Sequence, residues 1–347
     1  MTTNRNSLTD VLEGRRPEFI PFSIYGWEAM GDDPAWQYIV KQGLCRVMRI
    51  PVIKETLSSN VEKICQEEIV DGKPIYKTTL RTPLGELNQL LIKNHEQEYY
   101  LKTPNDYKIM KYIIENTKLE LDPKQFDETE KMLGDTGLTL IYGIRSPMQT
   151  MVVDYAGLEN FSYSLADGFP ELFELADVLL EQLIIYCNLV AKGPGRYFQL
   201  RENLTSDQWG PVRFSKYHMP VYEKIIPILH SGGKKVYTHF DGKLSCLSEL
   251  ISKTEIDGID SLTAPPEGNM TLKEARAAFP GKMFWVNINI SNYSLPPEKL
   301  KEIITESVYQ ASEDGRNLAF EISEDIPANW QESIPFVLDT LKNLKLA

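Results

Sequence analysis

Eight short apolar runs, most of them followed by a segment with helical character, constrain the fold of this 347-residue chain more than any other feature. The runs are rich in β-branched or aromatic residues and end at glycine, proline or polar residues, which is typical of buried strands. Strands that alternate with helices form a parallel sheet, and eight such units favour a closed (β/α)8 TIM barrel. The predicted strands cover residues 19–25, 45–50, 138–143, 197–202, 236–238, 258–262, 283–288 and 318–322.

One part of the chain departs from this alternation, between the second and third predicted strands. Residues 61–92 form alternating segments separated by glycine turns, which predicts an antiparallel β excursion after the second strand. Residues 103–133 are charged and are predicted to be helical. We therefore predict a single α/β barrel domain over residues 1–347, with the excursion and a helical segment inserted at about 61–133.

Charge, cysteine spacing and hydropathy exclude several functional classes. The net charge of −12 argues against a nucleic-acid-binding protein, which would show a basic face. The four cysteines have no paired spacing, which indicates reduced thiols in the cytoplasm. The amino terminus lacks the apolar core of a signal peptide, and no apolar run is long enough to span a membrane. We expect a cytoplasmic protein that binds a small molecule and neither nucleic acid nor a membrane, with a homodimer as a candidate assembly.

The stretch 235–243, Lys-Val-Tyr-Thr-His-Phe-Asp-Gly-Lys, places a histidine and an aspartate at the end of a predicted strand. Because strand side chains alternate between faces, His239 and Asp241 are predicted to point the same way. Such a pair can hold a divalent metal ion, or it can orient and charge a histidine for acid–base chemistry. A histidine held by a neighbouring aspartate for structural reasons is the alternative interpretation.

Two further carboxylates follow predicted strands. The active site of a TIM barrel lies at the carboxyl ends of its strands, where Glu202 and Glu321 would join His239 and Asp241. One imidazole with two or three carboxylates matches the ligand set of a catalytic zinc ion that keeps an open position. We therefore predict a metal site formed by these four residues, and His239, Asp241 and Glu202 as the catalytic residues.

The strand ends also carry arginines, aromatic residues and amides. The alternative to a metal site is that the carboxylates pair with Arg49, Arg145 or Arg201 and stabilise the rim of the barrel. Aromatic and amide side chains near the strand ends are candidates for substrate binding, and Trp285 is a further aromatic candidate that can equally belong to the core. The candidate substrate-binding residues are Tyr25, Trp27, Tyr142, Asn203, Trp209 and Asn287.

Several segments resemble the uroporphyrinogen decarboxylase superfamily, and together they cover most of the chain. They include Val11-Leu-Glu-Gly-Arg-Arg-Pro-Glu-Phe-Ile-Pro21, Thr82-Pro-Leu-Gly85, the strand ending Tyr-Thr-His-Phe-Asp-Gly242, and Val286-Asn-Ile-Asn289. The resemblance is weakest between residues 103 and 133. It implies a single (β/α)8 barrel, as the strand count does.

Two branches of that superfamily differ in their chemistry. Decarboxylases carry an arginine-rich segment after the first strand, but residues 23–30 of this chain, Ser-Ile-Tyr-Gly-Trp-Glu-Ala-Met, contain no arginine. Porphyrinogen carboxylates would therefore be poorly held. The other branch contains zinc methyltransferases that move methyl groups to or from a corrinoid protein or a thiol, and its thiol-using members bind zinc through His-x-Cys and a later cysteine. The resemblance places His239 on the histidine, Asp241 on the first cysteine and Glu321 on the second.

Replacement of both sulfur ligands by oxygen carries information about the substrate. A zinc ion with oxygen ligands is more electrophilic and suits an ether oxygen better than a thiolate. The resemblance implies a methyltransferase of the O-demethylase type, which moves a methyl group from a methoxylated aromatic to cobalt. Its expected cofactors are zinc and a corrinoid (cobalamin) carried by a partner protein.

Three other functions stay open at this point. One is a methyltransferase that uses an amine, a thioether or a thiol as its methyl donor. Another is a metal-free lyase, such as a decarboxylase, with His239 as the acid and Asp241 as its orienting partner. The last is a non-catalytic barrel that serves as a scaffold for a corrinoid protein.

Overall fold

The computed structural model describes residues 3–26, 33–93, 95–322 and 325–347 of the chain. The chain forms two compact units. The first comprises Met1–Val52, Pro123–Gly143 and Gly193–Ala347, and the second comprises Ile53–Asp122 and Ile144–Lys192. The prediction of one domain over residues 1–347 stays a prediction. Among the described residues, no helix has both the length and the apolar character that a membrane span requires.

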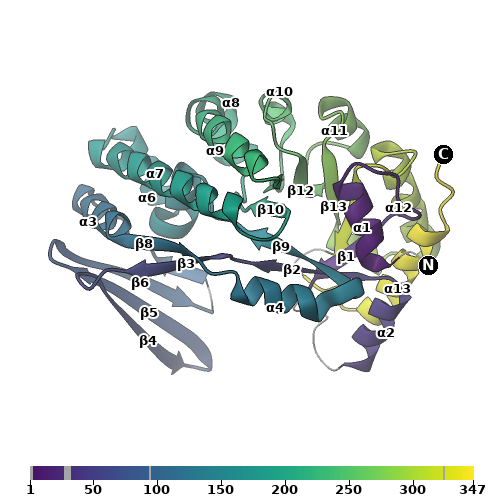
Figure 1. The fold of residues 1–347 in the computed structure, drawn as a ribbon, viewed down its shortest axis with the longest axis horizontal. Coiled ribbons are helices and arrows are strands. Elements are labelled where there is room, and N and C mark those ends of the chain that lie inside the picture. Colours follow the sequence, from purple (N-terminus) through teal and green to yellow (C-terminus); the bar gives the residue numbers. More distant parts are fainter. Residues whose placement is uncertain (1–2, 27–32, 94, 323–324) are drawn as a thin grey trace. The chain divides into compact units, whose positions relative to one another are not determined.

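A closed barrel of eight parallel strands forms the centre of the first unit, which confirms the predicted TIM barrel (Figure 1). Around the barrel the strand order is β1-β14-β13-β12-β11-β10-β9-β2. The first and last strands pair directly, with Phe22 opposite Phe320 and Ser23 opposite Glu321. The strands are β1 (Phe22–Tyr25), β2 (Cys45–Ile50), β9 (Gly137–Tyr142), β10 (Tyr197–Leu200), β11 (Lys235–His239), β12 (Gly258–Thr263), β13 (Met283–Ile288) and β14 (Leu318–Ile322).

Apolar side chains that alternate along the strands fill the barrel interior. Every second strand residue points inward, so the interior is built from residues two apart in sequence. The helix α1 (Asn4–Leu12) adds apolar residues to the same buried cluster, and the Tyr237 hydroxyl donates a hydrogen bond to the Leu12 carbonyl oxygen at 2.8 Å. The strand residues in this cluster are Cys45, Val47, Leu138, Leu140, Tyr197, Tyr237, Met283, Trp285 and Ala319.

The other helices of the first unit lie between the barrel strands or after the last one, and their ends follow local sequence signals. For example, the Thr271 hydroxyl accepts a hydrogen bond from the Glu274 backbone N–H, and the Glu274 carboxylate accepts one from Thr271, so that a capping box begins α11. These helices are α2 (Pro34–Gln42), α4 (Lys124–Leu133), α8 (Ser206–Tyr217), α9 (Met219–Ser231), α10 (Ser248–Ser252), α11 (Leu272–Ala278), α12 (Pro297–Ala311) and α13 (Trp330–Asn343), with short 3-10 turns η1 (Gly134–Thr136), η3 (Ser245–Leu247) and η4 (Ile290–Ser294).

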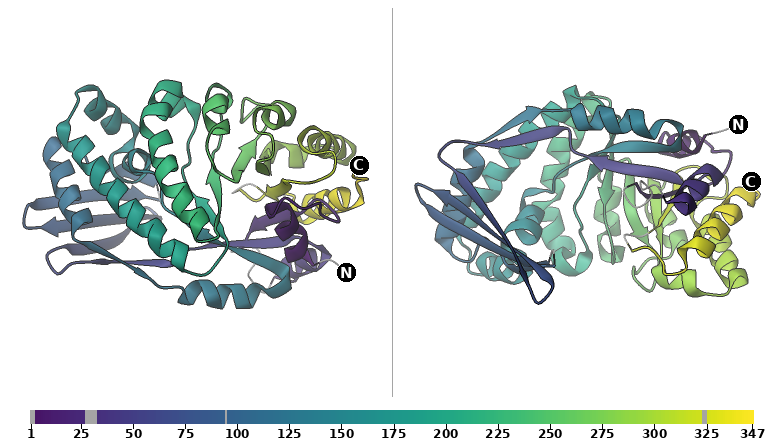
Figure 2. Two further views of the ribbon diagram at one scale, coloured as in Figure 1. Left: turned by 45° about the horizontal axis from the view of Figure 1, so that its top comes forward. Right: turned by 90° about the horizontal axis from the view of Figure 1, so that it is seen from below.

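The second unit contains the predicted antiparallel excursion. Strands β4 (Glu62–Val70), β5 (Lys73–Thr82), β6 (Gly85–Ile92) and β7 (His95–Glu98) pair in sequence order, and β4, β5 and β6 lie side by side in both views of Figure 2. The stretch 103–133 is not helical throughout, because β8 (Thr117–Leu121) lies within it and pairs with β3 (Ile53–Leu57). The helices of this unit are α3 (Pro104–Glu115), α5 (Pro147–Thr150), the π-helix η2 (Met151–Ala156), α6 (Gly157–Ala166) and α7 (Pro170–Lys192).

Candidate functional site

A polar layer lies directly above the apolar core of the barrel. It follows from the same alternation, because the residue two positions beyond a core residue also points inward. Val47 is followed in this way by Arg49, and Ala319 by Glu321. β12 contributes Asp260 from its middle, and the remaining strands contribute Tyr25, Tyr142, Gln199, His239 and Asn287 at or near their carboxyl ends. This is the end of a TIM barrel at which active sites are found.

Arg49 lies at the centre of the layer and binds two carboxylates. Its Nη2 donates a hydrogen bond to Glu321 Oε2 at 2.8 Å and lies 3.6 Å from Asp260 Oδ1. The guanidinium carbon lies 3.8 Å from the centre of the Tyr25 ring, a distance at which a cation–π interaction is favourable. The Ser23 hydroxyl lies 3.3 Å from Glu321 Oε1 and accepts a hydrogen bond from the Trp285 indole at 2.8 Å. Arg49 thus provides the positive charge that two buried acids share.

Asp260 also orients His239. His239 Nδ1 lies 3.1 Å from Asp260 Oδ2, and the Gln199 amide donates a hydrogen bond to the same oxygen. Asp260 occupies a bulge of β12, where the pairing with β13 shifts between Ile259 and Leu262 and Ser261 has a φ of 66°. Bulges re-aim side chains and recur beside active sites, which accounts for the direction of the Asp260 carboxylate.

The pKa values of the buried acids and of His239 are shifted in different directions. Burial would raise the pKa of Asp260, but the charge of Arg49 and the hydrogen bond with His239 lower it to about 2. Burial raises the pKa of Glu321 to about 7, against the opposing charge of Arg49. Burial would lower the pKa of His239, but the hydrogen bond and charge of Asp260, helped by Asp241, raise it. Near neutral pH the site therefore combines an ionised aspartate, a histidine that binds a proton readily and an arginine.

A cavity of 410 Å³ opens onto this layer. Its volume falls within the range of small-molecule sites. Two arginines reach it, each against a tyrosine ring: Arg49 lies over Tyr25, and the guanidinium carbon of Arg201 lies 4.9 Å from the centre of the Tyr142 ring. The residues that line the cavity are Tyr25, Arg49, Tyr142, Gln199, Arg201, Asn203 and His239.

The four predicted metal ligands do not lie together as one set. Glu202 is buried and accepts a hydrogen bond from the Tyr222 hydroxyl at 3.1 Å, while Glu321 is held by Arg49. Asp241 is half-buried beyond the last residue of β11, near enough to His239 to affect its pKa. In the part of the chain that the structure describes, no three His, Cys, Asp or Glu side chains form a group that could hold a metal ion.

A guanidinium also disfavours a second cation at this place. Arg49 lies between the buried carboxylates of Glu321 and Asp260, where it repels any further positive charge. As these side chains lie, they do not form a ready zinc site, and zinc binding stays a prediction. The alternative interpretation, in which a strand-end carboxylate pairs with Arg49, describes the observed contacts of Glu321. Arg145, by contrast, pairs with Asp154 within the second unit, at 2.8 Å.

The predicted orienting partner of His239 needs a correction. In the metal-free alternative Asp241 orients the imidazole, but the carboxylate that is hydrogen-bonded to His239 is that of Asp260. The reason is that β11 ends at His239, so the two-residue alternation does not extend to Asp241. Strand β10 likewise ends at Leu200, two residues before Glu202.

The predicted substrate-binding residues divide into three groups. Tyr25, Tyr142 and Asn203 line the cavity. Trp209 is buried against His218, with ring centres 4.4 Å apart, and the Asn287 amide donates a hydrogen bond to the Ser261 hydroxyl at 2.9 Å. Neither is among the residues that line the cavity. Trp27 lies outside the described residues, and Trp285 belongs to the core.

Arg49, Arg201, Gln199 and Asp260 were not predicted as site residues, although each belongs to the cavity or to its hydrogen-bonded wall. A sequence signal for three of them exists. Arg49, Gln199 and Asp260 are polar residues inside otherwise apolar strands, and a barrel interior accepts such residues only where they have partners.

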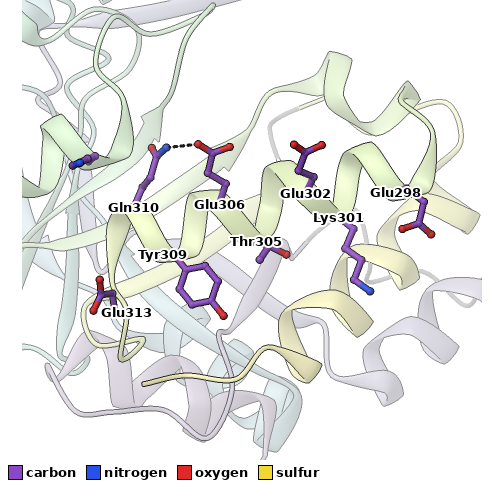
Figure 3. A pocket seen from close by; sticks show the side chains of 9 residues that line it. Glu298, Lys301, Glu302, Thr305, Glu306, Tyr309, Gln310 and Glu313 are labelled. Atoms are coloured by element: carbon purple, nitrogen blue, oxygen red, sulfur yellow. Dashed lines mark hydrogen bonds between the residues drawn. The ribbon is translucent and has the colours of Figure 1, made fainter.

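A larger hollow of 800 Å³ lies on the outside of the first unit. Figure 3 shows that most of its side chains project from α12, where the Gln310 amide donates a hydrogen bond to Glu306 at 2.8 Å. None of the residues that line it is buried. Without a desolvated polar group the hollow lacks the feature that distinguishes the barrel cavity.

Comparisons with known proteins show the fold. No protein-family model matches the chain, and no curated protein sequence matches it. Among solved structures, a methyltransferase from Methanosarcina mazei superposes with a TM-score of 0.58 at 12% identity, covering 98% of this chain and 98% of that chain. The IOLI protein with a binding zinc atom shares 13% identity over 62% of this chain and 78% of that chain, with a TM-score of 0.33, which is too low to carry an argument.

Proposed function

We propose that this chain is a methyltransferase that moves a methyl group from a small methoxylated aromatic to the cobalt of a corrinoid protein. The observation that carries the proposal is the buried pair of His239 and Asp260 beside a tyrosine-lined cavity. Further support comes from the barrel, whose backbone is similar to that of a methyltransferase along 98% of the chain.

His239 would act as the general acid. Asp260 engages Nδ1, and in the part of the chain that the structure describes no hydrogen bond engages Nε2 of this ring, which lines the cavity. A carboxylate behind a histidine fixes the orientation of the ring and stabilises its protonated form. Nε2 is therefore the atom from which a proton would pass to a bound substrate.

The departing group of an aryl methyl ether is a phenolate, which leaves more easily when its oxygen is protonated. As the O–CH3 bond breaks, the ether oxygen would take the proton of His239 Nε2 and become a phenol. The methyl carbon would bond to the acceptor, a reduced cobalt(I) corrinoid that supplies the electron pair. Asp260 and Arg49 keep their charges throughout, so that they stabilise the site without taking part in the exchange.

Tyr25 and Tyr142 would bind the aromatic ring of the donor. Both line the cavity, and both have a guanidinium against one ring face. Aromatic side chains bind flat rings through stacked or edge contacts. Asn203, at the same cavity, adds an amide for a polar substituent of the ring.

The test is methyl transfer to free cob(I)alamin. Purified protein would be mixed with chemically reduced cobalamin and, in turn, with methoxybenzenes, methylamines, thioethers and methylthiols. We expect methylcobalamin and the corresponding phenol to form with a methoxybenzene. If no methoxylated aromatic gives methylcobalamin, the proposed donor is wrong, and formation from an amine or a sulfur compound would identify the other donor class.

Zinc is tested by metal content. Elemental analysis of the untagged protein beside His239→Ala would show whether bound zinc depends on this residue. Stoichiometric zinc that is lost in the variant would require Glu321 or Asp241 to turn toward His239, because neither is hydrogen-bonded to it in the structure. Methyl transfer that survives complete removal of metal would leave proton donation by His239 as the mechanism.

A metal-free lyase is the second candidate, and one observation favours it. Two arginines at the cavity, Arg49 and Arg201, suit an acidic substrate, and His239 would protonate the carbanion left by loss of carbon dioxide. Carbon dioxide release from an aromatic acid, without any corrinoid, would distinguish this function from methyl transfer.

A further inference from the structure

Two arginines at the same cavity carry buried N–H groups without acceptors. The Arg49 side chain is only 2% exposed, and among the described residues its Nε and Nη1 have no hydrogen-bond partner. Arg201 reaches the cavity from the segment that follows β10, and its buried Nε also lacks a partner within the described chain. Buried donors of this kind are rare in native proteins, because they lose their hydrogen bonds to water without replacement.

The two arginines differ in how their charge is balanced. Arg49 contacts Glu321 and Asp260 through Nη2, so the protein itself supplies its counter-charge. Arg201 has no such partner: no carboxylate of the described residues lies within 4.0 Å of its nitrogens. It contacts Tyr142, whose hydroxyl lies 3.5 Å from Nη1 and whose ring lies beside the guanidinium. Carboxylates of the protein thus balance the charge of the Arg49 guanidinium. Among the described residues they do not balance the charge of Arg201.

A tyrosine ring lies against each guanidinium, and each arginine still has buried N–H groups without an acceptor among the described residues. The fork of N–H donors in an arginine matches the two oxygens of a carboxylate, and it binds them in a fixed plane. An arginine stacked on an aromatic ring is therefore prepared for such a ligand before the ligand arrives. Arg49 and Arg201 both have this arrangement, at a cavity of 410 Å³ that also offers two tyrosine rings.

We propose that the cavity binds a single-ring aromatic carboxylate, with Arg201 and the unpartnered Nε and Nη1 donors of Arg49 as the receptors of the carboxylate. The methyl donor is accordingly a methoxylated aromatic acid and not a neutral methoxyarene. The identity of the donor rests on the proposed function, whereas binding of the carboxylate does not require turnover.

Binding is measured first, without any corrinoid. Isothermal titration calorimetry would compare 4-methoxybenzoate with 4-methoxybenzamide, which has the same size and no charge. We expect the acid to bind at least about tenfold more tightly than the amide, because only the acid offers the arginine N–H groups a charged pair of acceptor oxygens. Equal affinities of the two compounds would overturn the proposal.

Variants then identify the receptor. Arg201→Gln should weaken binding of 4-methoxybenzoate at least about tenfold and leave binding of the amide within about twofold. Arg201→Lys, which keeps the charge and loses the fork, should fall between the two. The matched control is Arg213→Gln. Arg213 is an exposed residue of α8 that does not line the cavity, so this variant should bind the acid as tightly as the natural chain does. Unchanged affinity in Arg201→Gln contradicts the assignment.

Turnover separates this inference from the proposed function. Methyl transfer to cob(I)alamin would be compared for 2-, 3- and 4-methoxybenzoate and for methoxybenzene, with a higher kcat/KM expected for at least one of the acids. Tight binding of the acids without methyl transfer would retain the carboxylate site and reject the methyltransferase. Methyl transfer from methoxybenzene that no acid exceeds would retain the methyltransferase and reject the carboxylate site.

Discussion

The barrel has a histidine–aspartate pair at each end, and the two pairs have opposite surroundings. At the amino end, His230 Nε2 lies 2.9 Å from Asp257 Oδ2, and the two side chains are 35% and 21% exposed. At the carboxyl end, His239 Nδ1 lies 3.1 Å from Asp260 Oδ2, with exposures of 7% and 1%. The hydrogen-bond distances are nearly the same, so distance alone does not separate a structural pair from a functional one.

The partners of the two aspartates make the difference. Asp257 accepts hydrogen bonds from the backbone N–H of Val236 at 2.8 Å and from Lys235 Nζ at 3.3 Å, so it ties the start of β11 to the segment before β12. Asp260 Oδ1 has no hydrogen-bond partner in the part of the chain that the structure describes, although Arg49 lies nearby. In a TIM barrel the residues at the amino end contribute to stability and those at the carboxyl end carry out the chemistry. The hydrogen bonds agree with this division, because the oxygens of Asp257 have partners whereas Oδ1 of Asp260 has none among the described residues.

Substitution of the histidine in each pair is expected to give the largest difference between the two ends of the barrel, measured as the rate of methyl transfer. His239→Gln should lower the rate of methyl transfer about 100- to 10,000-fold, because it removes the general acid. His230→Gln should leave the rate within about twofold, since surface substitutions away from a site have small effects. Initial rates of methylcobalamin formation measure both. Similar losses in the two variants would mean that His239 has no chemical role.

Substitution of one arginine at each end of the barrel compares how much the two ends contribute to the free energy of unfolding. Arg49→Met leaves Asp260 and Glu321 buried without a counter-charge and should lower the free energy of unfolding by about 3–5 kcal/mol. Arg196→Met at the amino end breaks a half-exposed ion pair with Glu13 and should cost at most about 1 kcal/mol. Urea unfolding followed by circular dichroism measures both costs. Equal costs would show that burial at the carboxyl end does not strengthen the pairing.

The smallest expected effect concerns pH. The hydrogen bond from Arg196 lowers the pKa of Glu13 from its ordinary 4.5 to about 2, although burial opposes this shift. Because the folded pKa lies below the unfolded one, Glu13 stabilises the fold above about pH 4.5 and loses this contribution as the pH falls toward 2. The difference in unfolding free energy between the natural chain and Glu13→Gln, about 1 kcal/mol at pH 6, should therefore shrink by pH 3. A difference that does not change with pH would refute the ion pair.

Most of the fold could be predicted because each barrel strand is a short buried run of apolar residues. The excursion was also recognisable from its alternating segments and turns. Strand β8 was missed, since Thr-Lys-Leu-Glu-Leu has two charged residues in five and, among the described strands, pairs with β3 alone. Such a segment resembles the surface of a helix as much as an edge strand.

The site was harder to predict than the fold. The sequence places His239 and Glu321 at strand ends, and the structure confirms those positions. Their partners depend on where each strand ends and on the bulge at Ser261, which turns Asp260 toward His239. A shift of one residue reverses the direction of a side chain, so neither feature could be read from the order of residue types.

The pairing of β1 with β14 has a consequence for the synthesis of the chain. Ser23 and Glu321 lie opposite each other, although nearly the whole chain separates them. Contacts this distant in sequence form late in folding. A nascent chain that stops before Leu318 would lack β14, leaving β1 and β13 with open edges that favour aggregation, and Arg49 without its hydrogen-bonded acid. Barrel closure and assembly of the charged cluster would therefore coincide, so incomplete chains would carry neither a closed sheet nor a complete site.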